Sequence, residues 1–283
     1  KTTVYLMIAK KRGQAIASPL FKGKNMKPQV VLSLFDGMSC GQIALNRLGI
    51  PIKTYYASEV DPYPIKVTQA NYPDTIQLGD VRDISLESLP ERPDILLAGA
   101  PCQGFSFAGK QLNFEDPRSK LFFDFVRVLK ILKPKYFLLE NVRMKKESQD
   151  IISKYLGVEP RVFNSNKASA QNRHRLYWFN WEVDELEDKG IVLADILEDG
   201  VTDREKSHCI DANYFKGGNL KSYFQKHRRQ LVFTNRCIQE GEADIKETYR
   251  KLSCLEVERL QTVPDNYTAH VSNSRRYQCL GNG

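Results

Sequence analysis

Short apolar runs alternate with helical patterns through the first half of the chain. Five runs rich in branched and aromatic residues occur between positions 30 and 140. They are VVLSLF (30–35), TYYASE (54–59), TIQL (75–78), DILLAG (94–99) and YFLLE (136–140). Such alternation predicts parallel strands joined by crossover helices. The expected fold class is therefore α/β, with a doubly wound, mostly parallel sheet and helices on both faces.

Two helices are expected in this half. After Ser119, apolar residues recur with a period of about 3.6 as far as Leu132, and Pro134 ends the pattern. We expect this helix to pack on the sheet. A shorter helix is expected over residues 42–48, directly after the first apolar run.

The pattern breaks into short pieces after Asn180. An acidic stretch (182–188), a Gly-rich turn (216–219) and a basic run (226–229) follow, and a helical pattern returns at residues 251–261. We therefore expect a second, smaller domain of mostly irregular structure. The expected parts are an amino-terminal arm (1–28), a main domain (29–180), a small domain (181–250) and a return to the main domain (251–283).

Composition narrows the class of protein. With 41% hydrophobic and 27% charged residues, the chain is typical of a globular protein. A net charge of +8 favours a polyanionic partner, because each neutralised phosphate releases a counterion. The six cysteines are too scattered for a zinc pattern or a disulfide scaffold, so a reducing, intracellular setting is expected. The apolar run at residues 4–9 is too short for a secretory core or a membrane span.

The first predicted strand runs into a turn with two glycines. A ligand can approach the backbone closely there, because Gly37 and Gly41 carry no side chain. Glu59 follows the second strand, where a doubly wound sheet places a carboxylate that accepts hydrogen bonds from ribose hydroxyls. Asp80, after the third strand, is expected at the same edge, as an acceptor for an adenine amino group. A plain tight turn and surface carboxylates are the alternatives.

Two reactive groups follow the fourth and fifth strands. Cys102 stands on a loop between Pro101 and Gly104, and Glu140 ends the fifth strand. Position alone leaves a buried structural cysteine and a solvated glutamate as alternatives. A thiolate and a carboxylic acid beside a ligand pocket suit thiolate addition to an electron-poor pyrimidine ring.

Six short motifs follow one another in order along the chain. They are Phe35-Asp36-Gly37, Pro101-Cys102-Gln103, Glu140-Asn141-Val142, Gln171-Asn172-Arg173-His174-Arg175, Arg259-Leu260-Gln261 and Gly281-Asn282. This series, from Val30 to Gly283, resembles the DNA cytosine-5 methyltransferases, and most of all the bacterial and phage modification enzymes. The resemblance implies S-adenosyl-L-methionine as the cofactor and double-stranded DNA as the substrate. The fold it implies is the Rossmann-like methyltransferase sheet with a small irregular target-recognition domain.

The resemblance also implies a mechanism. Cys102 attacks carbon 6 of a cytosine flipped out of the duplex, and carbon 5 then takes the methyl group. Glu140 hydrogen-bonds or protonates ring nitrogen 3, which requires a protonated or shared-proton carboxyl that burial favours. One of Arg173 and Arg175 binds oxygen 2 of the base. Their spacing in an extended run predicts that both side chains point to one face; without the resemblance they would be interpreted as solvated charges.

Further contacts follow from the resemblance. The expected cofactor contacts are Phe35, Asp36, Gly37, Glu59, Val60, Asp80, Val81, Pro101, Leu121 and Asn282. The expected DNA contacts are Gln103, Ser106, Lys216, Lys226, Arg228 and Arg229. No metal ion is expected.

The small domain corresponds to the family's target-recognition region. Its basic run and Gly-rich turn suit a groove-facing loop, with a solvated charged face as the alternative. Residues 251–261 resemble the family's bracing helix, to which we assign a structural role. The chain stops at Gly283, where the family usually continues into a final helix. We therefore expect that helix to be absent, or its place to be taken by the amino-terminal arm.

The expected partners and setting complete the hypothesis. The protein is expected to act as a monomer on DNA, with a cognate restriction endonuclease as a further partner and no membrane. A bacterial cytoplasm is the expected location, or a nucleus if the host is eukaryotic. A transfer-RNA cytosine-5 methyltransferase and a DNA-binding module that has lost catalysis are two alternatives on the same scaffold. The presence of both Cys102 and Glu140 favours an active enzyme.

Overall fold

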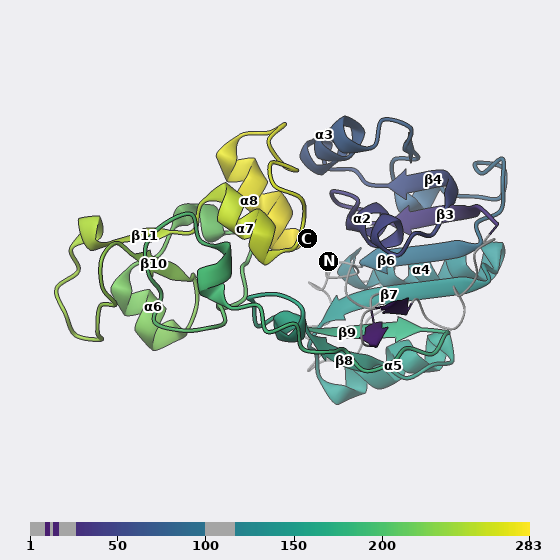
Figure 1. Cartoon of the computed structure of the whole chain (residues 1–283). Helices are drawn as coiled ribbons and strands as arrows, with labels where there is room; N and C mark the ends of the chain where they lie inside the picture. The colour runs from purple at the N-terminus through teal and green to yellow at the C-terminus, as the bar shows by residue number, and fades with distance from the viewer. Residues whose placement is uncertain (1–8, 12–13, 17–26, 100–116) are drawn as a thin grey trace. The chain divides into compact units, whose positions relative to one another are not determined.

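The computed structural model describes residues 9–11, 14–16, 27–99 and 117–283 (Figure 1). These residues fold into two compact units. Unit 1 contains the described residues up to Phe163 together with His174–Glu185, and unit 2 contains Asn164–Arg173 and Leu186–Gly283. At the amino-terminal end, β1 (Ala9–Lys11) and β2 (Gln14–Ile16) form a separate antiparallel pair.

A seven-stranded sheet in the order β5-β4-β3-β6-β7-β9-β8 forms the centre of unit 1 (Figure 1). Strands β3 to β7 pair in parallel, whereas β9 runs antiparallel to β7. The strands are β3 (Gln29–Leu34), β4 (Ile52–Ser58), β5 (Ile76–Gln77), β6 (Ile95–Gly99), β7 (Tyr136–Val142), β8 (Arg161–Asn164) and β9 (His174–Phe179). The predicted α/β class and all five predicted strands are confirmed.

The helices of unit 1 cover both faces of this sheet. They are α2 (Cys40–Arg47), α3 (Pro62–Asn71), α4 (Pro117–Leu132) and α5 (Lys146–Leu156), with a 3-10 turn, η2 (Val81–Asp83). Phe122 and Phe125 of α4 share one buried cluster with Leu96. Gly41 of α2 lies so close to Leu97 that a Cβ on it would come within 2.8 Å of Leu97 Cδ1. Because neighbouring residues of a strand face opposite sides, α2 and α4 pack on opposite faces, as predicted.

Both predicted helices are confirmed, with small shifts of their ends. The longer helix begins at Pro117 and ends at Leu132, where Lys133 adopts a left-handed φ of 45° before Pro134. The shorter helix begins at Cys40, earlier than expected. Strand β3 is buried over five of its six residues, as expected for a parallel strand covered on both faces.

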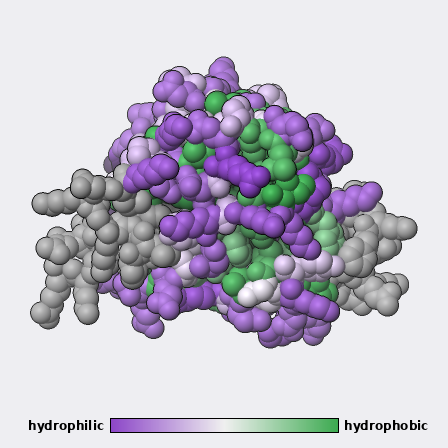
Figure 2. All heavy atoms as spheres, turned by 90° about the vertical axis from the view of Figure 1, so that its right-hand side faces the viewer, coloured by the Kyte–Doolittle hydropathy of each residue, from purple (hydrophilic) through white to green (hydrophobic). Residues whose placement is uncertain are grey.

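The surface of the described residues is mainly hydrophilic. Figure 2 shows one face on which polar side chains predominate and hydrophobic ones gather in patches between them. The exposed large hydrophobic residues that the structure describes come from separate elements, such as Leu86, Ile131 and Val162. Scattered apolar side chains of this kind are normal on a protein surface. In the described ranges, every helix is too short or too polar to cross a bilayer.

Unit 2 consists of short elements around small cores. They are η4 (Ser165–Lys167), η5 (Leu193–Ile196), η6 (Tyr214–Lys216), α6 (Leu220–Lys226), β10 (Leu231–Phe233), η7 (Lys246–Thr248), β11 (Tyr249–Lys251), α7 (Cys254–Leu260) and α8 (Asn273–Asn282). Strands β10 and β11 pair antiparallel. Tyr223, Leu231 and Phe233 are fully buried in one core of this unit. The irregular structure predicted for residues 181–250 agrees with this arrangement.

The boundaries of the compact units differ from the predicted domain boundaries. Residues 251–283 were expected to return to the main domain, yet they belong to unit 2. The hydroxyl of Tyr277 in α8 donates to the carbonyl of Leu252 at 2.8 Å, and its ring packs edge-on against Tyr214 at 5.7 Å. These buried aromatic contacts hold the last helix to the rest of unit 2. The functional division of the chain into domains stays a prediction.

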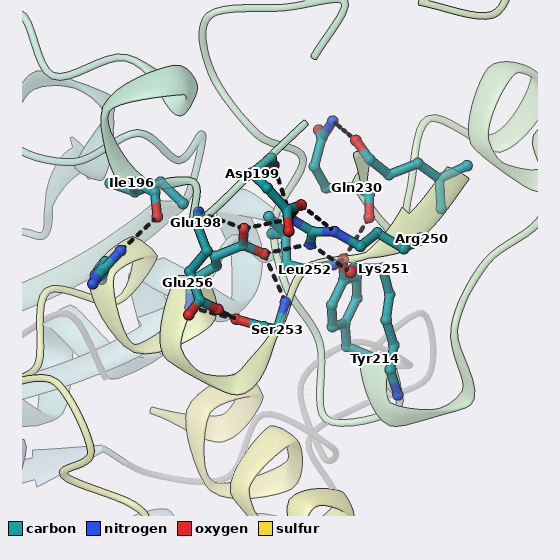
Figure 3. A network of polar contacts seen from close by, with 12 residues as sticks. Ile196, Glu198, Asp199, Tyr214, Gln230, Arg250, Lys251, Leu252, Ser253 and Glu256 are labelled. Atoms are coloured by element: carbon teal, nitrogen blue, oxygen red, sulfur yellow. Dashed lines mark hydrogen bonds and ion pairs between the residues drawn. The ribbon is translucent and has the colours of Figure 1, made fainter. Parts of the chain in front are cut away.

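A buried carboxylate anchors several segments of unit 2 (Figure 3). Glu256 has no exposed surface, and Arg250 donates to its two carboxylate oxygens at 2.7 and 2.8 Å. The backbone N–H groups of Glu198 and Ser253 donate to the same carboxylate at 2.9 and 2.7 Å. Arg250 also pairs with Asp199, and its hydrogen bonds to Glu256 raise the pKa of the guanidinium. A buried charge is tolerated only when it is paired and hydrogen-bonded in this way.

Replacement of Glu256 by Gln is expected to destabilise unit 2, because it leaves Arg250 facing an uncharged amide. Breaking a buried pair costs about 3–5 kcal/mol, and the lower end applies here because the Arg250 side chain is 30% exposed. Chemical denaturation measures the change in the free energy of unfolding. Arg236→Gln, in the surface pair with Glu242, is the matched control and should change it much less. Equal losses in the two variants would contradict this role of Glu256.

Acid is expected to destabilise unit 2 through His208. Its Nε2 accepts a hydrogen bond from Arg204 at 2.6 Å, and burial together with the charges of Arg204 and His227 lowers its pKa to about 4. The unfolded histidine titrates near 6.5, so the unfolded chain binds more protons between these values and stability falls as the pH drops from about 6.5 to about 4. Thermal unfolding at pH 7 and pH 4.5 should show a smaller acid shift for His208→Gln. Parallel shifts in both proteins would rule this out.

Candidate active site

The carboxyl ends of the parallel strands meet at one edge of the unit 1 sheet. The loop 35–39 follows β3, residues 59–61 follow β4, and residues 78–80 follow β5. Glu140 lies near the end of β7 and pairs in register with Gly99, the last residue of β6. The four predicted site residues on the segment after Gly99 lie outside the described residues; they are Pro101, Cys102, Gln103 and Ser106.

The loop after β3 is strained and firmly held. Phe35, Gly37 and Ser39 have left-handed φ values of 53°, 62° and 59°. Glycine adopts this conformation easily, but phenylalanine and serine do so only where the surroundings fix them. Buried Asp36 supplies this support, because its carboxylate accepts hydrogen bonds from Tyr55 Oη at 2.9 Å and from the Ser39 hydroxyl. Asp36 was predicted as a cofactor contact, whereas these bonds give it a role in shaping the loop.

Glu59 joins this loop to the end of β4. Its Oε2 accepts from the Gly37 N–H at 2.8 Å, and its Oε1 accepts from the N–H groups of Val60 and Asp61 at 2.8 and 2.9 Å. A carboxylate has about four lone-pair positions, so it can accept a further hydrogen bond from a ligand hydroxyl. Beside it, the Val60 side chain is 67% exposed. This edge therefore presents an acceptor next to an exposed apolar surface.

Asp80 caps the 3-10 turn η2. Its carboxylate accepts from the N–H and the Nε of Arg82, both at 2.9 Å, and also pairs with the Arg82 Nη2. The hydrogen bonds from the Arg82 side chain lower the pKa of Asp80 to about 2, so the group is ionised at neutral pH. Of the neighbouring predicted contacts, Val81 is buried and Leu121 of α4 is half-buried.

Glu140 and Arg175 form a buried ion pair across β7 and β9. The Nε of Arg175 lies 3.0 Å from Glu140 Oε1, and the two side chains are 13% and 7% exposed. Their closeness follows from the register, because Arg175 is opposite Val142, two residues from Glu140 on the same face. Nη1 of Arg175 donates to the His174 carbonyl at 2.8 Å. Within the described ranges, Arg175 Nη2 makes no hydrogen bond.

Arg173 has different surroundings from Arg175. Strand β9 begins at His174, so Arg173 precedes it, and its side chain is buried in unit 2. Its guanidinium donates to the carbonyls of Ile210 at 3.1 Å and Gly283 at 2.6 Å. The two arginines, which were expected on one face with one of them bound to the base, therefore have different partners: Arg175 pairs with Glu140, whereas Arg173 binds main-chain carbonyls.

The predicted DNA contacts in unit 2 are not all alike. Lys216, Lys226 and Arg228 are exposed, and Arg228 forms only a loose pair with Asp211 at 3.4 Å. Arg229 is half-buried, and its Nη1 donates to the Gly217 carbonyl at 2.8 Å, which stabilises the Gly-rich turn. Gly218 approaches this arginine so closely that a Cβ would lie 3.2 Å from the Arg229 carbonyl oxygen. Arg229 therefore has a structural contact that the basic run did not reveal.

Two further sequence predictions concern the chain end and metals. Asn282 is exposed at the end of α8, in unit 2. Over the described part of the chain, no group of His, Cys, Asp and Glu side chains is arranged to hold a metal ion. The sequence reasoning missed Tyr55 and Arg82, whose polar groups hold Asp36 and Asp80. The apolar alternation around Tyr55 predicts a strand but not the hydrogen bond of its hydroxyl.

Comparison with known proteins gives the family. The sequence matches the C-5 cytosine-specific DNA methylases over residues 30–199 and 184–283. The type II methyltransferase M.NlaIV of Neisseria lactamica is 47% identical over 115 residues, which cover 39% of this chain and 27% of that protein. The match thus spans about a quarter of that relative's length. The type II methyltransferase M.HpaII of Haemophilus parainfluenzae is 30% identical over 312 residues, covering 89% of this chain and 84% of that protein.

A solved structure supports the fold. The methyltransferase EhMeth of Entamoeba histolytica superposes with a TM-score of 0.71 at 17% identity, covering 91% of this chain and 94% of that chain. This likeness concerns the arrangement of strands and helices alone. The family match extends across nearly all of both units, so the chain belongs to the C-5 cytosine-specific DNA methylases.

Proposed function

We propose that the protein transfers a methyl group from S-adenosyl-L-methionine to carbon 5 of a flipped-out cytosine in a specific double-stranded DNA sequence. The buried pair of Glu140 and Arg175 is the observation that carries this proposal. The pair lies beside Gly99, from which the chain leads in three residues to Cys102. A carboxyl group and a guanidinium near a cysteine suit the addition of a thiolate to a pyrimidine ring, and the place of Cys102 in this group is inferred from the sequence.

The proposed chemistry begins with the thiolate of Cys102. It forms a bond to carbon 6 of cytosine, and the electron pair displaced from the 5,6 double bond becomes available at carbon 5. Glu140, hydrogen-bonded at ring nitrogen 3, stabilises the charge that spreads onto the ring. When bound, S-adenosyl-L-methionine would supply the electrophilic methyl group that carbon 5 takes with this electron pair, and S-adenosylhomocysteine would be the leaving group. Loss of the carbon-5 proton to a base then restores the double bond and expels the thiolate of Cys102.

Arg175 is the arginine that we assign to oxygen 2 of the base. Its Nε lies against Glu140 and its Nη1 donates to the His174 carbonyl, while among the described residues Nη2 has no hydrogen-bond partner and can donate to a ligand. A guanidinium engaged in this way has a fixed plane, which suits it to orient both the carboxyl group and the base. Arg173, the other candidate from the sequence, donates to main-chain carbonyls of unit 2 instead.

The edge formed by the loop 35–39, Glu59 and Asp80 suits the adenosine part of the cofactor. Glu59 has acceptor capacity left for ribose hydroxyls, and Asp80 is ionised and can accept from an amino group. Exposed Val60 offers an apolar surface for a purine ring. These properties support the contacts that the resemblance implied, and Asp36 stays a proposed cofactor contact that also shapes the loop.

Double-stranded DNA is the proposed partner. The net charge of +8 and the exposed cations Lys216, Lys226 and Arg228 support contacts with phosphates. The names of M.NlaIV and M.HpaII describe type II methyltransferases. A cognate restriction endonuclease, action as a monomer and a bacterial cytoplasmic location remain parts of the proposal.

The protein is expected to form a denaturation-resistant adduct with duplex DNA containing 5-fluorocytosine in the presence of tritiated S-adenosyl-L-methionine. Fluorine cannot leave as a proton does, so the bond from Cys102 to carbon 6 persists. Gel electrophoresis under denaturing conditions detects the adduct, and Cys102→Ala is the control that should form none. If transfer RNA forms an adduct and DNA does not, transfer RNA is the substrate. If the protein binds DNA but forms no adduct, it is a DNA-binding module that lacks catalysis.

Arg175→Lys and Arg173→Lys are expected to have different effects. Lysine keeps a charge near Glu140 but lacks a second donor, so the single-turnover rate of Arg175→Lys should fall by a factor of about 100–1,000. Arg173→Lys cannot reach both the Ile210 and Gly283 carbonyls, so its main effect should be a lower melting temperature. Rapid-quench kinetics and thermal unfolding separate the two effects. Equal rate losses with unchanged melting would refute this division.

A further inference from the structure

Arg127 joins helix α4 to the turn that carries Asp80. The guanidinium donates to the carbonyl oxygens of Ile84 at 2.6 Å, Val81 at 2.8 Å and Arg82 at 3.3 Å. These three carbonyls belong to η2 and to the residue that follows it. One side chain therefore binds most of this turn from a helix more than forty residues further along the chain.

Inside the turn η2, few backbone hydrogen bonds fix its shape. It is only three residues long, and its internal bonds run from the Asp83 N–H to the Asp80 carbonyl at 3.1 Å and from the Ile84 N–H to the Val81 carbonyl at 3.3 Å. Hydrogen bonds in 3-10 turns have poor geometry, and such turns are short for this reason. Without Arg127, the Ile84 carbonyl would lose the donor that the structure describes for it, and the Val81 carbonyl would keep only the long bond from the Ile84 N–H.

Asp124 on the same helix helps to orient the guanidinium of Arg127. Its Nε lies 3.5 Å from the carboxylate of Asp124, one turn earlier on α4. The planar group then directs its Nη atoms to the carbonyls, with Nη1 on Ile84 and Nη2 shared between Val81 and Arg82. A lysine ammonium has no such fork and cannot bind all these acceptors in a fixed geometry.

Arg127 joins two elements that carry proposed cofactor contacts, the turn η2 next to Asp80 and the helix α4 with Leu121. Val81 and Ile84 anchor the turn in the core of unit 1, while Asp80 lies partly exposed at its start with its carboxylate held by Arg82. On the other side, α4 carries Leu121, the half-buried residue expected to contact the cofactor. Arg127 thus links the turn that follows Asp80 to the helix that carries Leu121.

We propose that Arg127 is a positioning residue for the adenosine part of the cofactor, which acts by holding η2 against α4. This inference rests on the proposed function, because it takes S-adenosyl-L-methionine to bind at this edge. Arg127 does not contact the ligand in this proposal. Loss of Arg127 allows η2 to move relative to α4. The carboxylate of Asp80 and the side chain of Leu121 then no longer contact the same purine ring.

The test compares Arg127→Met and Arg127→Lys with the parent protein and with Lys130→Met, an exposed lysine on the same helix. Calorimetry measures the Kd of S-adenosylhomocysteine and of adenosine, which lacks the amino-acid end. Loss of two or three hydrogen bonds that order the site should raise both Kd values about tenfold. The KM for S-adenosyl-L-methionine should rise by a similar factor, while kcat, the Kd for duplex DNA and the behaviour of Lys130→Met stay as in the parent.

The outcomes separate this inference from the proposed function. Cofactor Kd values within twofold of the parent in a folded Arg127→Lys or Arg127→Met protein would overturn the inference. Equal losses of cofactor and DNA affinity, accompanied by a lower melting temperature, would also overturn it, since they mark a residue that only stabilises unit 1. If the parent protein binds neither S-adenosylhomocysteine nor adenosine, the proposed function itself fails.

Discussion

A buried carboxylate needs a full set of donors, and this requirement shapes both units. Glu140 is paired with Arg175 across two strands, and Glu256 is held by Arg250 and two backbone N–H groups. Glu258 accepts from Arg276 at 3.0 Å and from the N–H groups of residues 266 and 268. Because an unpaired buried charge costs several kcal/mol, each carboxylate fixes the segments that supply its donors. In the irregular unit 2, such contacts add to the small hydrophobic cores in fixing the structure.

The same requirement supports a strained loop where a ligand is expected. Three left-handed residues within the segment 35–39 would not persist in a free chain. The buried carboxylate of Asp36 and the partly buried one of Glu59 hold the loop from inside, through Ser39, Tyr55 and the Gly37 N–H. Their donors come from β4 and from the loop itself, so the sheet determines the shape of the edge. The loop is therefore already ordered in the folded protein, and a ligand that binds there does not have to order it.

Apolar patterns in the sequence were enough to predict the sheet, α2 and α4, because burial on two faces leaves a continuous hydrophobic run or a 3.6-residue period. They were not enough to assign partners to polar side chains. The spacing of Arg173 and Arg175 indicated a shared face. However, β9 begins only at His174, and Arg173 binds the carbonyl of Ile210, which is distant in the sequence. The placement of residues 251–283 in unit 2 likewise depends on the packing of Tyr277. The prediction for Cys102 rests on sequence alone.

The pairing of Glu140 with Arg175 bears on how a proton would reach the base. Burial favours a neutral carboxyl group, whereas a guanidinium nitrogen 3.0 Å away favours the charged form. The two effects oppose each other, so a bound base can shift the balance. In the proposed complex, oxygen 2 of cytosine accepts a hydrogen bond from Arg175 Nη2. This interaction strengthens as the ring becomes electron-rich, and Glu140 then shares a proton with nitrogen 3. In this proposal Arg175 holds the carboxylate before the base arrives and stabilises the ring afterwards, and the register of β7 and β9 brings both groups together.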